Sequence, residues 1–358
     1  MKRYGDLFGK LISFENLYQA SRKARAGKRG KPGCAAFEMD IEEELMRLRR
    51  ELADKTYRPG PYREFTIYES KERKISAAPY RDRVVHHALC NIIEPIFEKS
   101  FIYDSYACRP GKGTHAAVNR FTAYVRNYPY VLKMDIRKYF PSIDHEILYK
   151  KIAKKIKCPD TLWLIRLIIA GSNPQEEINE YFPGDDLFTP YQRRRGIPIG
   201  NLTSQFFANI YLNDLDHFIK EHLACPGYIR YVDDLTIFAD DKKRLWEIAG
   251  ETARFLQQER LTLHPGKTLV APVTEGSDHL GYRVFPTHRR LRRDNVVRFR
   301  RKLKRLVEGY RCGRFTGTEM RAAVMSWIGH AAHADTWGLR GKILEREGYG
   351  RYRRLFLP

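Results

Sequence analysis

Several common signals are missing from this sequence. Its six cysteines, at positions 34, 90, 108, 158, 225 and 312, form no CxxC pair and no cluster with histidine. Neither a disulfide framework nor a zinc site is therefore expected. The N-terminus lacks the apolar core of about 7–15 residues that a signal peptide needs, and no run approaches the ~18 apolar residues of a membrane span. These absences predict a cytoplasmic protein without a membrane partner.

Acidic residues are scarce relative to basic ones. The chain has 65 Lys and Arg against 43 Asp and Glu, a formal net charge of +22, which is unusual for a cytosolic metabolic enzyme. Such a surface attracts polyanions, and nucleic acid is the expected partner. With 358 residues, 43% of them hydrophobic, the chain has enough apolar material for a packed core and about two domains.

The residue pattern divides the chain into three parts. Residues 1–56 are predicted to be a helical, basic N-terminal extension, with a linker at 22–31 that is either a solvated charge run or a nucleic-acid contact. Residues 57–285 interleave strands and helices without a glycine-rich βαβ fingerprint. This favours an α+β fold, an antiparallel sheet flanked by helices, over a doubly wound sheet. Residues 286–358 are predicted to be helical and strongly basic.

Hydrophobic periodicity predicts individual elements within these parts. The expected elements are a two-stranded ribbon at 62–79 with a charged turn at Ser70–Arg73, a helix ending at Pro95, a strand at Tyr130–Ile136, a helix after Ile143, a helix at Leu162–Ala170, one buried helix at Asn201–Ile219, a hairpin at 228–239, a helix near 242–260, short strands around Leu269 and Tyr282, and a basic helix at 289–306.

The predicted hairpin contains two adjacent aspartates, Asp233 and Asp234, in IRYVDDLTIF. Two neighbouring carboxylates repel each other, and tight turns favour Asn-Gly or Asp-Gly, so this pair is a poor choice for stability. A bound divalent cation would turn the repulsion into attraction. A third carboxylate is available in YVLKMDIRKYF, where Asp135 follows an apolar strand. Three carboxylates around two Mg²⁺ ions about 4 Å apart would form a site for nucleotidyl transfer.

These motifs resemble those of a known family. YVDD at 231–234, downstream of MDIRKYFPSID at 134–144, is similar to the palm of bacterial reverse transcriptases of the group II intron and retron-like lineage. Other segments of the chain resemble further motifs of the family, and they occur in the family's order. Before the palm motifs stand KERKISAAPYRDRVVHHAL (71–89) and YACRPGKGTHAAV (106–118), and after them stand LTLHPGKT (261–268) and HLGY (279–282). The resemblance implies a right-hand polymerase with fingers, palm and a short helical thumb. Its expected activity is RNA-directed DNA synthesis on an RNA template, with a DNA or RNA primer, dNTPs and an RNA–DNA hybrid.

The resemblance also implies roles for single residues. Asp135 and Asp233 would hold two Mg²⁺ ions, with Mn²⁺ as a substitute, Asp234 would complete the acidic cluster, and the carbonyl of Ile136 would be a further ligand. Phe140 falls where the family keeps an aromatic gate against the ribose 2′-hydroxyl, although core packing is an alternative. The nucleotide-binding residues implied are Arg73, Lys74 and Arg81 for the triphosphate, unless they belong to a charged hairpin turn, and Lys267 near the leaving pyrophosphate.

One segment, IGNLTSQ at 199–205, departs from the wider family, which tends to have Gln-Gly where this chain has Ile199 and Gly200. Isoleucine cannot donate the hydrogen bond of an amide, so a nucleotide pocket there would rely on shape and be less accurate. The pattern is most similar to the reverse transcriptases of diversity-generating retroelements, which copy a template RNA with errors at adenines. That subtype implies a small basic helical accessory protein as a partner.

Nucleic-acid contacts are expected along the basic C-terminal part and in several motifs. The run at 289–306 alternates cationic and apolar residues, as in a helix laid along a duplex backbone. The residues predicted to bind nucleic acid are Arg109, Gln205, Tyr231, Gly281, Arg298, Arg301 and Lys304.

Other functions share parts of this pattern. A related bacterial reverse transcriptase in phage defence or a retron-like element would have the same catalytic motifs. A maturase-like RNA-binding scaffold is a second alternative, but a scaffold gains nothing from a repulsive acidic cluster. A DNA-templated polymerase is a third.

Overall fold

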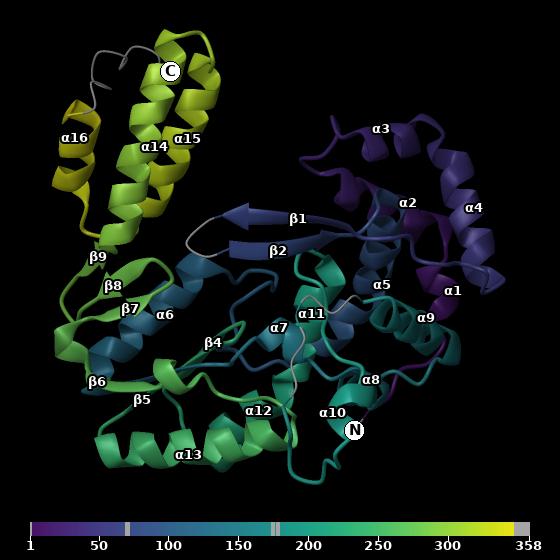
Figure 1. Cartoon of the computed structure of the whole chain (residues 1–358), viewed down its shortest axis with the longest axis horizontal. Helices are drawn as coiled ribbons and strands as arrows, with labels where there is room; N and C mark the ends of the chain where they lie inside the picture. The colour runs from purple at the N-terminus through teal and green to yellow at the C-terminus, as the bar shows by residue number, and fades with distance from the viewer. Residues whose placement is uncertain (1, 69–71, 173–175, 177–179, 347–358) are drawn as a thin grey trace.

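The computed structural model describes residues 2–68, 72–172, 176 and 180–346. Helices and antiparallel strands alternate along the chain, which confirms the α+β fold class (Figure 1). The α-helices are α1 Phe8–Leu11, α2 Phe14–Arg25, α3 Pro32–Met39, α4 Ile41–Ala53, α5 Tyr80–Glu98, α6 Thr114–Asn127, α7 Tyr139–Ser142, α8 His145–Ala153, α9 Pro159–Ala170, α10 Thr189–Gln192, α11 Leu202–Tyr211, α12 Asn213–His217, α13 Lys242–Gln258, α14 Arg293–Arg311, α15 Gly317–Ala331 and α16 Trp337–Arg346.

The described strands form three antiparallel sheets. A ribbon pairs β1 with β2, a four-stranded sheet has the order β4-β5-β3-β6, and a small sheet has the order β7-β8-β9. The strands are β1 Arg63–Tyr68, β2 Glu72–Ala77, β3 Tyr130–Asp135, β4 Tyr228–Tyr231, β5 Asp234–Ala239, β6 Leu269–Pro272, β7 Ser277–His279, β8 Tyr282–Val284 and β9 Arg289–Leu291. The predicted ribbon, the 228–239 hairpin and the strand after residue 129 are confirmed.

The two faces of the four-stranded sheet differ in character. Successive side chains of a strand point to opposite faces, so Leu132 and Met134 of β3 face the larger hydrophobic core. Val131, Lys133 and Asp135 face the other way, and Val131 joins a second core with α6 and the C-terminal helices. This second face is apolar at one end and carries charged side chains at the other.

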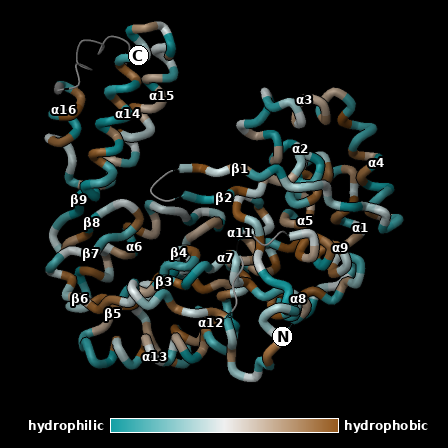
Figure 2. Tube along the Cα trace, viewed as in Figure 1, coloured by the Kyte–Doolittle hydropathy of each residue, from teal (hydrophilic) through white to brown (hydrophobic). Residues whose placement is uncertain are grey.

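Amphipathic helices cover the larger core. In α13, the Asp241 carboxylate accepts a hydrogen bond from the Arg244 amide at 2.9 Å and caps the first turn. Buried residues then recur at helical spacing, including Leu245, Ile248 and Leu256. Helix α13 packs against β3, β5 and β6, while α11 packs against α5 and α8. Figure 2 shows hydrophobic and hydrophilic segments alternating along α13 and α14, as this packing requires.

The C-terminal helices lie above the small β7-β8-β9 sheet in Figure 1. Phe299 of α14 stacks on Trp327 of α15 with ring centroids 3.9 Å apart. Thr316 and Glu319 form a capping box that begins α15. None of the helices in the described ranges has both the length and the apolar character needed to cross a membrane.

A buried asparagine joins the ribbon to the segment that precedes α11. The Asn201 side chain accepts a hydrogen bond from the Ala78 amide at 3.1 Å and donates one to the Ser76 carbonyl at 2.9 Å. The Ser76 amide in turn donates to the Ile199 carbonyl at 3.0 Å. The position of the ribbon over the sheet is therefore set by polar contacts that are shielded from water.

Two helix predictions were wrong in extent. Helix α5 does not stop at Pro95 but continues to Glu98. Proline removes one helical hydrogen bond, and the burial of Ile96 and Phe97 offsets that loss. The single helix predicted at Asn201–Ile219 is interrupted at Leu212, where φ is −91° and ψ is 3°. Helix α12 follows, and then one π-helical segment at Phe218–His222.

Three further segments differ from the predictions. Arg22, Lys23 and Arg25 of the expected basic linker belong to α2. Arg289–Leu291 of the expected basic helix forms strand β9, because it pairs with β8 before α14 begins. In the predicted charged turn at Ser70–Arg73, residues 70 and 71 lie outside the described residues, and Arg73 belongs to β2.

The three-part division at 1–56, 57–285 and 286–358 stays a prediction. The N-terminal helices share the larger core with residues as far along the chain as Leu261, and the second core extends from Tyr106 to Ile343. Residues 347–358 of the predicted thumb lie outside the described residues.

Replacing Asn201 by alanine is expected to destabilise the protein. Asn201→Ala leaves a buried amide and a buried carbonyl without their partner, which costs about 1–3 kcal/mol of unfolding free energy. Urea denaturation followed by circular dichroism measures the change, with the exposed Asn119→Ala as the matched control. Equal stabilities of the two variants would contradict this account.

Candidate active site

The β4–β5 hairpin carries two of the three predicted carboxylates. Tyr231 pairs with Asp234 at the end of the ladder, so Val232 and Asp233 form the two-residue turn. The tip is thus Val232–Asp233 rather than the expected pair of aspartates, and Asp234 is the first residue of β5. Val232 has φ +58°, a left-handed conformation that is strained for a β-branched residue. The surroundings of this turn must therefore hold it in place.

Asp135 is the last residue of β3 and lies directly opposite Asp234 in the antiparallel ladder. Residues opposite each other in a ladder project from the same face. The Ile136 amide also donates a hydrogen bond to the Asp233 carbonyl at 3.3 Å, which joins β3 to the turn. The carboxylates of Asp135, Asp233 and Asp234 therefore meet at one end of the four-stranded sheet.

The electrostatics of this cluster are unfavourable for Asp233. Burial, together with the neighbouring carboxylates of Asp234 and Asp135, raises the pKa of Asp233 to about 6. The ammonium of Lys267 opposes this shift and forms an ion pair with Asp135. On the same face of β3, burial lowers the pKa of Lys133. The cluster thus carries excess negative charge in a partly desolvated place.

The donor atoms of this cluster are of the kind that a divalent cation prefers, but they are not drawn together around one point. Hard carboxylate oxygens that repel one another are the ligands that Mg²⁺ prefers. Within the described ranges, no group of three or more His, Cys, Asp or Glu side chains is gathered tightly enough to hold a metal ion. The ammonium of Lys267 lies against Asp135 and brings one positive charge to the cluster. Asp135, Asp233 and Asp234 would be the side-chain ligands, and the Ile136 carbonyl stays a predicted one.

The residues predicted to contact the nucleotide sugar and base, Phe140, Ile199 and Gly200, are linked by a backbone hydrogen bond between their two segments. The Ile197 amide donates to the carbonyl of the half-buried Phe140 at 3.0 Å. Two residues later, Ile199 is also half-buried. Gly200 has φ +117°, and a Cβ there would lie 2.8 Å from Cγ2 of Ile75 in the ribbon. Glycine is therefore required where this segment passes β2.

The predicted triphosphate clamp is only partly assembled. Arg73 is exposed on β2, and Lys74 pairs with Glu64 on the adjacent strand at 2.7 Å. Arg81 instead forms an ion pair with Glu51 of α4. Arg81 would have to break this ion pair before it could bind a triphosphate. In the free protein, the ion pair joins α4 to α5.

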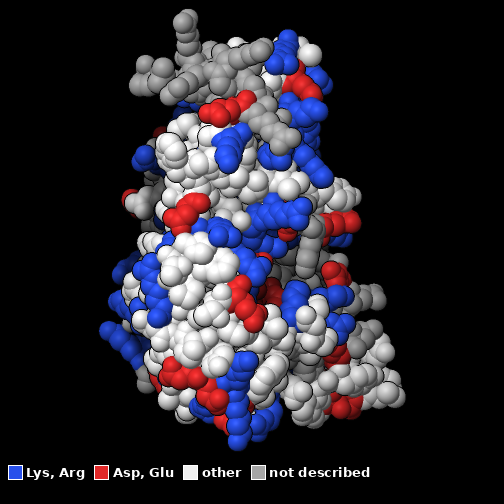
Figure 3. All heavy atoms as spheres, turned by 90° about the vertical axis from the view of Figure 1, so that its left-hand side faces the viewer, with Lys and Arg blue, Asp and Glu red and all other residues white. Residues whose placement is uncertain are grey.

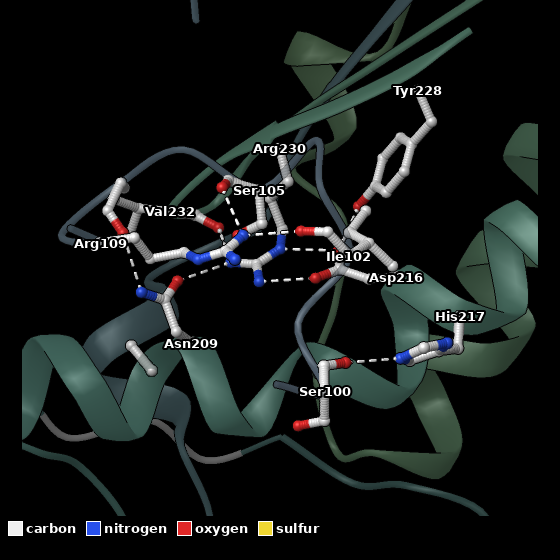
Figure 4. A network of polar contacts seen from close by, with 12 residues as sticks. Ser100, Ile102, Ser105, Arg109, Asn209, Asp216, His217, Tyr228, Arg230 and Val232 are labelled. Atoms are coloured by element: carbon white, nitrogen blue, oxygen red, sulfur yellow. Dashed lines mark hydrogen bonds and ion pairs between the residues drawn. The ribbon is translucent and has the colours of Figure 1, made fainter. Parts of the chain in front are cut away.

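Arg109, predicted to bind nucleic acid, is turned into the protein. Its side chain is only 5% exposed and pairs with Glu98 at 2.6 Å. It also donates to the carbonyls of Ile102 and Ser105 at 2.6 and 2.7 Å (Figure 4). These donors are not available for phosphate, so the structure gives Arg109 a structural place instead.

Three other predicted nucleic-acid residues lie in different settings. Gln205 is exposed on α11. The Tyr231 hydroxyl lies 3.2 Å from Oγ1 of Thr114. Gly281 has φ +93° and accepts a hydrogen bond from Asn295 at 3.1 Å. Their contacts with nucleic acid stay predictions.

The cations predicted on α14 are presented to solvent. Arg298, Arg301 and Lys304 are exposed and spaced three residues apart, which places them on one side of the helix. In the face drawn in Figure 3, Lys and Arg side chains occur on the upper part of the molecule, where the C-terminal helices lie, and also over its middle and lower parts. This surface suits a phosphate backbone better than the buried Arg109 does.

Sequence reasoning missed the polar network beneath the turn. Arg230 is fully buried in β4 and pairs with Asp216 of α12 (Figure 4). The available signal was a charged residue at the inward position of the otherwise apolar stretch YIRY. Such a residue is rarely buried without a partner.

The sequence of this chain matches a known family and several known proteins. The family model described as reverse transcriptase (RNA-dependent DNA polymerase) matches residues 62–284. Protein YkfC of Escherichia coli (strain K12) is 24% identical over 294 residues, which are 71% of this chain and 74% of YkfC. The group II intron-encoded protein LtrA of Lactococcus lactis subsp. cremoris is 28% identical over 216 residues, 59% of this chain.

The chain covers 33% of the length of LtrA. A third relative, the 91 kDa protein in cob intron of Schizosaccharomyces pombe, is 30% identical over 149 residues, 42% of this chain and 17% of that protein. The matched segment contains all three carboxylates of the sheet end and most of the chain. By this match, the chain belongs to the reverse transcriptase (RNA-dependent DNA polymerase) family.

Proposed function

We propose that the chain copies RNA into DNA by nucleotidyl transfer with two Mg²⁺ ions, and that it does so inaccurately, as the polymerase of a diversity-generating retroelement. The observation that supports the catalytic part is the convergence of Asp135, Asp233 and Asp234 at one sheet end. Family membership supports the use of RNA as template and of divalent cations. When bound, the metal ions would supply activation of the primer 3′-hydroxyl and neutralisation of the leaving pyrophosphate.

The protein's own groups have separate tasks in this proposal. Asp233, with its pKa raised to about 6, is ionised at neutral pH and available as a ligand. Lys267 is bound to Asp135 in the free protein and can release that carboxylate, which places its charge beside the triphosphate. Phe140 would exclude the ribose 2′-hydroxyl by collision. Arg298, Arg301 and Lys304 would hold the backbone of the RNA–DNA hybrid.

The diversity-generating role rests on the nucleotide pocket. A half-buried Ile199 offers shape but no hydrogen bond to an incoming base, so mismatched pairs are rejected less strongly. A small basic accessory protein would be its partner. A phage-defence or retron-like enzyme would share the catalytic geometry, and the errors in the product distinguish these roles.

Primer extension by the purified protein on a generic RNA template with Mg²⁺ and dNTPs tests the polymerase. The Asp233→Asn/Asp234→Asn variant is expected to lose at least ~10²-fold in rate, because the carboxylates that would hold the metals are removed. Asp240→Asn, an exposed aspartate at the other end of β5, is the matched control. Sequenced products should carry errors concentrated opposite adenine.

Faithful cDNA would contradict the diversity-generating role and keep the polymerase. Absence of extension on every template, even with an accessory protein added, would contradict the polymerase and favour an RNA-binding scaffold.

Asp233→Asn is expected to stabilise the metal-free protein at neutral pH. Because the folded-state pKa of about 6 lies above the ordinary value of 3.8, ionised Asp233 destabilises the fold by an amount that grows between these two pH values and is constant above the higher one. The gain from the variant, about 1–2 kcal/mol at pH 7.5 after allowance for partial exposure, should shrink as the pH falls from 6 to 4 and vanish below about pH 3, where Asp233 is protonated in both the folded and the unfolded state. Urea denaturation in EDTA measures it, and a variant less stable than the unmodified protein at pH 7.5 would contradict the shift.

Ile199→Gln is expected to make synthesis more accurate. One restored hydrogen bond of about 1 kcal/mol corresponds to a roughly fivefold lower error frequency opposite adenine. Sequencing of cDNA made by Ile199→Gln and by the apolar control Ile199→Leu measures the effect. Equal error frequencies in the two products would exclude this position as the source of inaccuracy.

A further inference from the structure

Arg230 lies beneath the catalytic turn and is fully buried, with 0% of its surface exposed. A guanidinium shielded from water is costly unless it is paired and its donors are used. The pair is bidentate, because Nε and Nη2 donate to the two Asp216 carboxylate oxygens, each at 2.7 Å. This accounts for the burial of the charge but leaves Nη1 for other acceptors.

Nη1 of Arg230 reaches the turn itself. It donates to the Val232 carbonyl at 3.2 Å and to Oδ1 of Asn209 at 3.1 Å (Figure 4). Val232 is the strained residue of the turn, with φ +58°, and Asp233 follows it directly. One side chain therefore connects a rigid buried pair to the residue that sets the direction of a catalytic carboxylate.

The anchors of this contact are fixed in turn by other elements. The Tyr228 hydroxyl donates to Asp216 at 2.8 Å, and Nδ2 of Asn209 donates to the Ala107 carbonyl at 2.8 Å. Helices α11 and α12, strand β4 and the segment before α6 thus converge on one guanidinium. A network with its members satisfied is rigid, whereas a partly satisfied one is costly.

We propose that Arg230 is a positioning residue for nucleotidyl transfer. It holds the Val232 carbonyl, keeps the turn in its left-handed conformation and so directs Asp233 towards Asp135 and Asp234. This inference rests on the proposed catalytic role of Asp233. The planar fork of arginine is required, because a lysine ammonium is a point charge that cannot bond both Asp216 oxygens and the turn carbonyl in this geometry.

Arg230→Lys keeps the charge beside Asp216 but loses the fork. The rate constant of single-nucleotide addition is expected to fall about 10–100-fold, since small displacements of catalytic groups have effects of this size, while the KM for dNTP stays within about threefold. Lys151→Met is the matched control. It removes another buried cation, which bridges Asp214 and Glu259 at 2.7 and 2.9 Å.

A rescue experiment separates positioning from general stability. Glycine adopts positive φ without strain, so Val232→Gly should need less support from Arg230. Added to Arg230→Lys, Val232→Gly is expected to raise the rate constant of nucleotide addition at least about fivefold. Added to Lys151→Met, it is expected to leave that rate constant unchanged. Arg230→Met/Asp216→Leu, which replaces the pair by apolar side chains, should behave like Arg230→Lys and serves if the lysine variant does not fold.

Hydrogen–deuterium exchange of the segment 228–236 measures the stability of the turn and does not depend on polymerase activity. Faster exchange confined to the turn is expected in the Arg230 variants and not in Lys151→Met. An exchange rate equal to that of the unmodified protein, or loss of activity that Val232→Gly leaves unchanged, would overturn the proposal. If the unmodified protein does not extend primers, the proposed function fails, and the exchange experiment still decides whether Arg230 holds the turn.

Discussion

A guanidinium shielded from water needs a carboxylate beside it, and Asp216 of α12 meets this need for Arg230 of β4. The pair forces α12 to lie against the back of the hairpin, so the strand cannot slide without exposing a charge to an apolar core. The register of β4 against β5 is fixed in the same way, since a shift by one residue would reverse every side chain. The end of the sheet is therefore defined by a buried charge as much as by hydrophobic contacts.

This rigid base supports an arrangement that is unfavourable by itself. Asp135, Asp233 and Asp234 meet where burial raises the pKa of Asp233, and Val232 is held in a strained conformation. Strain and like-charge repulsion concentrated in one place are common where a site is arranged for binding or chemistry. The cost is local, because both faces of the sheet away from this end pack into hydrophobic cores.

The large positive charge of the chain is divided between two uses. Some cations are tied to carboxylates within the fold, as Arg109 is to Glu98 and Arg81 to Glu51. Others are exposed on one side of α14 and face solvent. The first group joins elements of the fold, and the second is accessible to a polyanion. Net charge alone therefore indicates a nucleic-acid partner but not the residues that contact it.

The sequence by itself determined the α+β class, the ribbon, the hairpin and the three carboxylates, because alternation, turns and acidic residues at strand ends are local signals. It also carried the family motifs in order. The interruption at Leu212, the strand at Arg289–Leu291 and the continuation of α5 past Pro95 depended on packing between distant segments, which outweighs local propensity.

Only the tertiary structure decided which charged residues are internal. It placed Arg230 under the β4–β5 turn, where its guanidinium pairs with Asp216, and it joined Asn201 to the ribbon. A buried polar side chain is defined by the acceptors around it, and these are brought together only when the chain has folded.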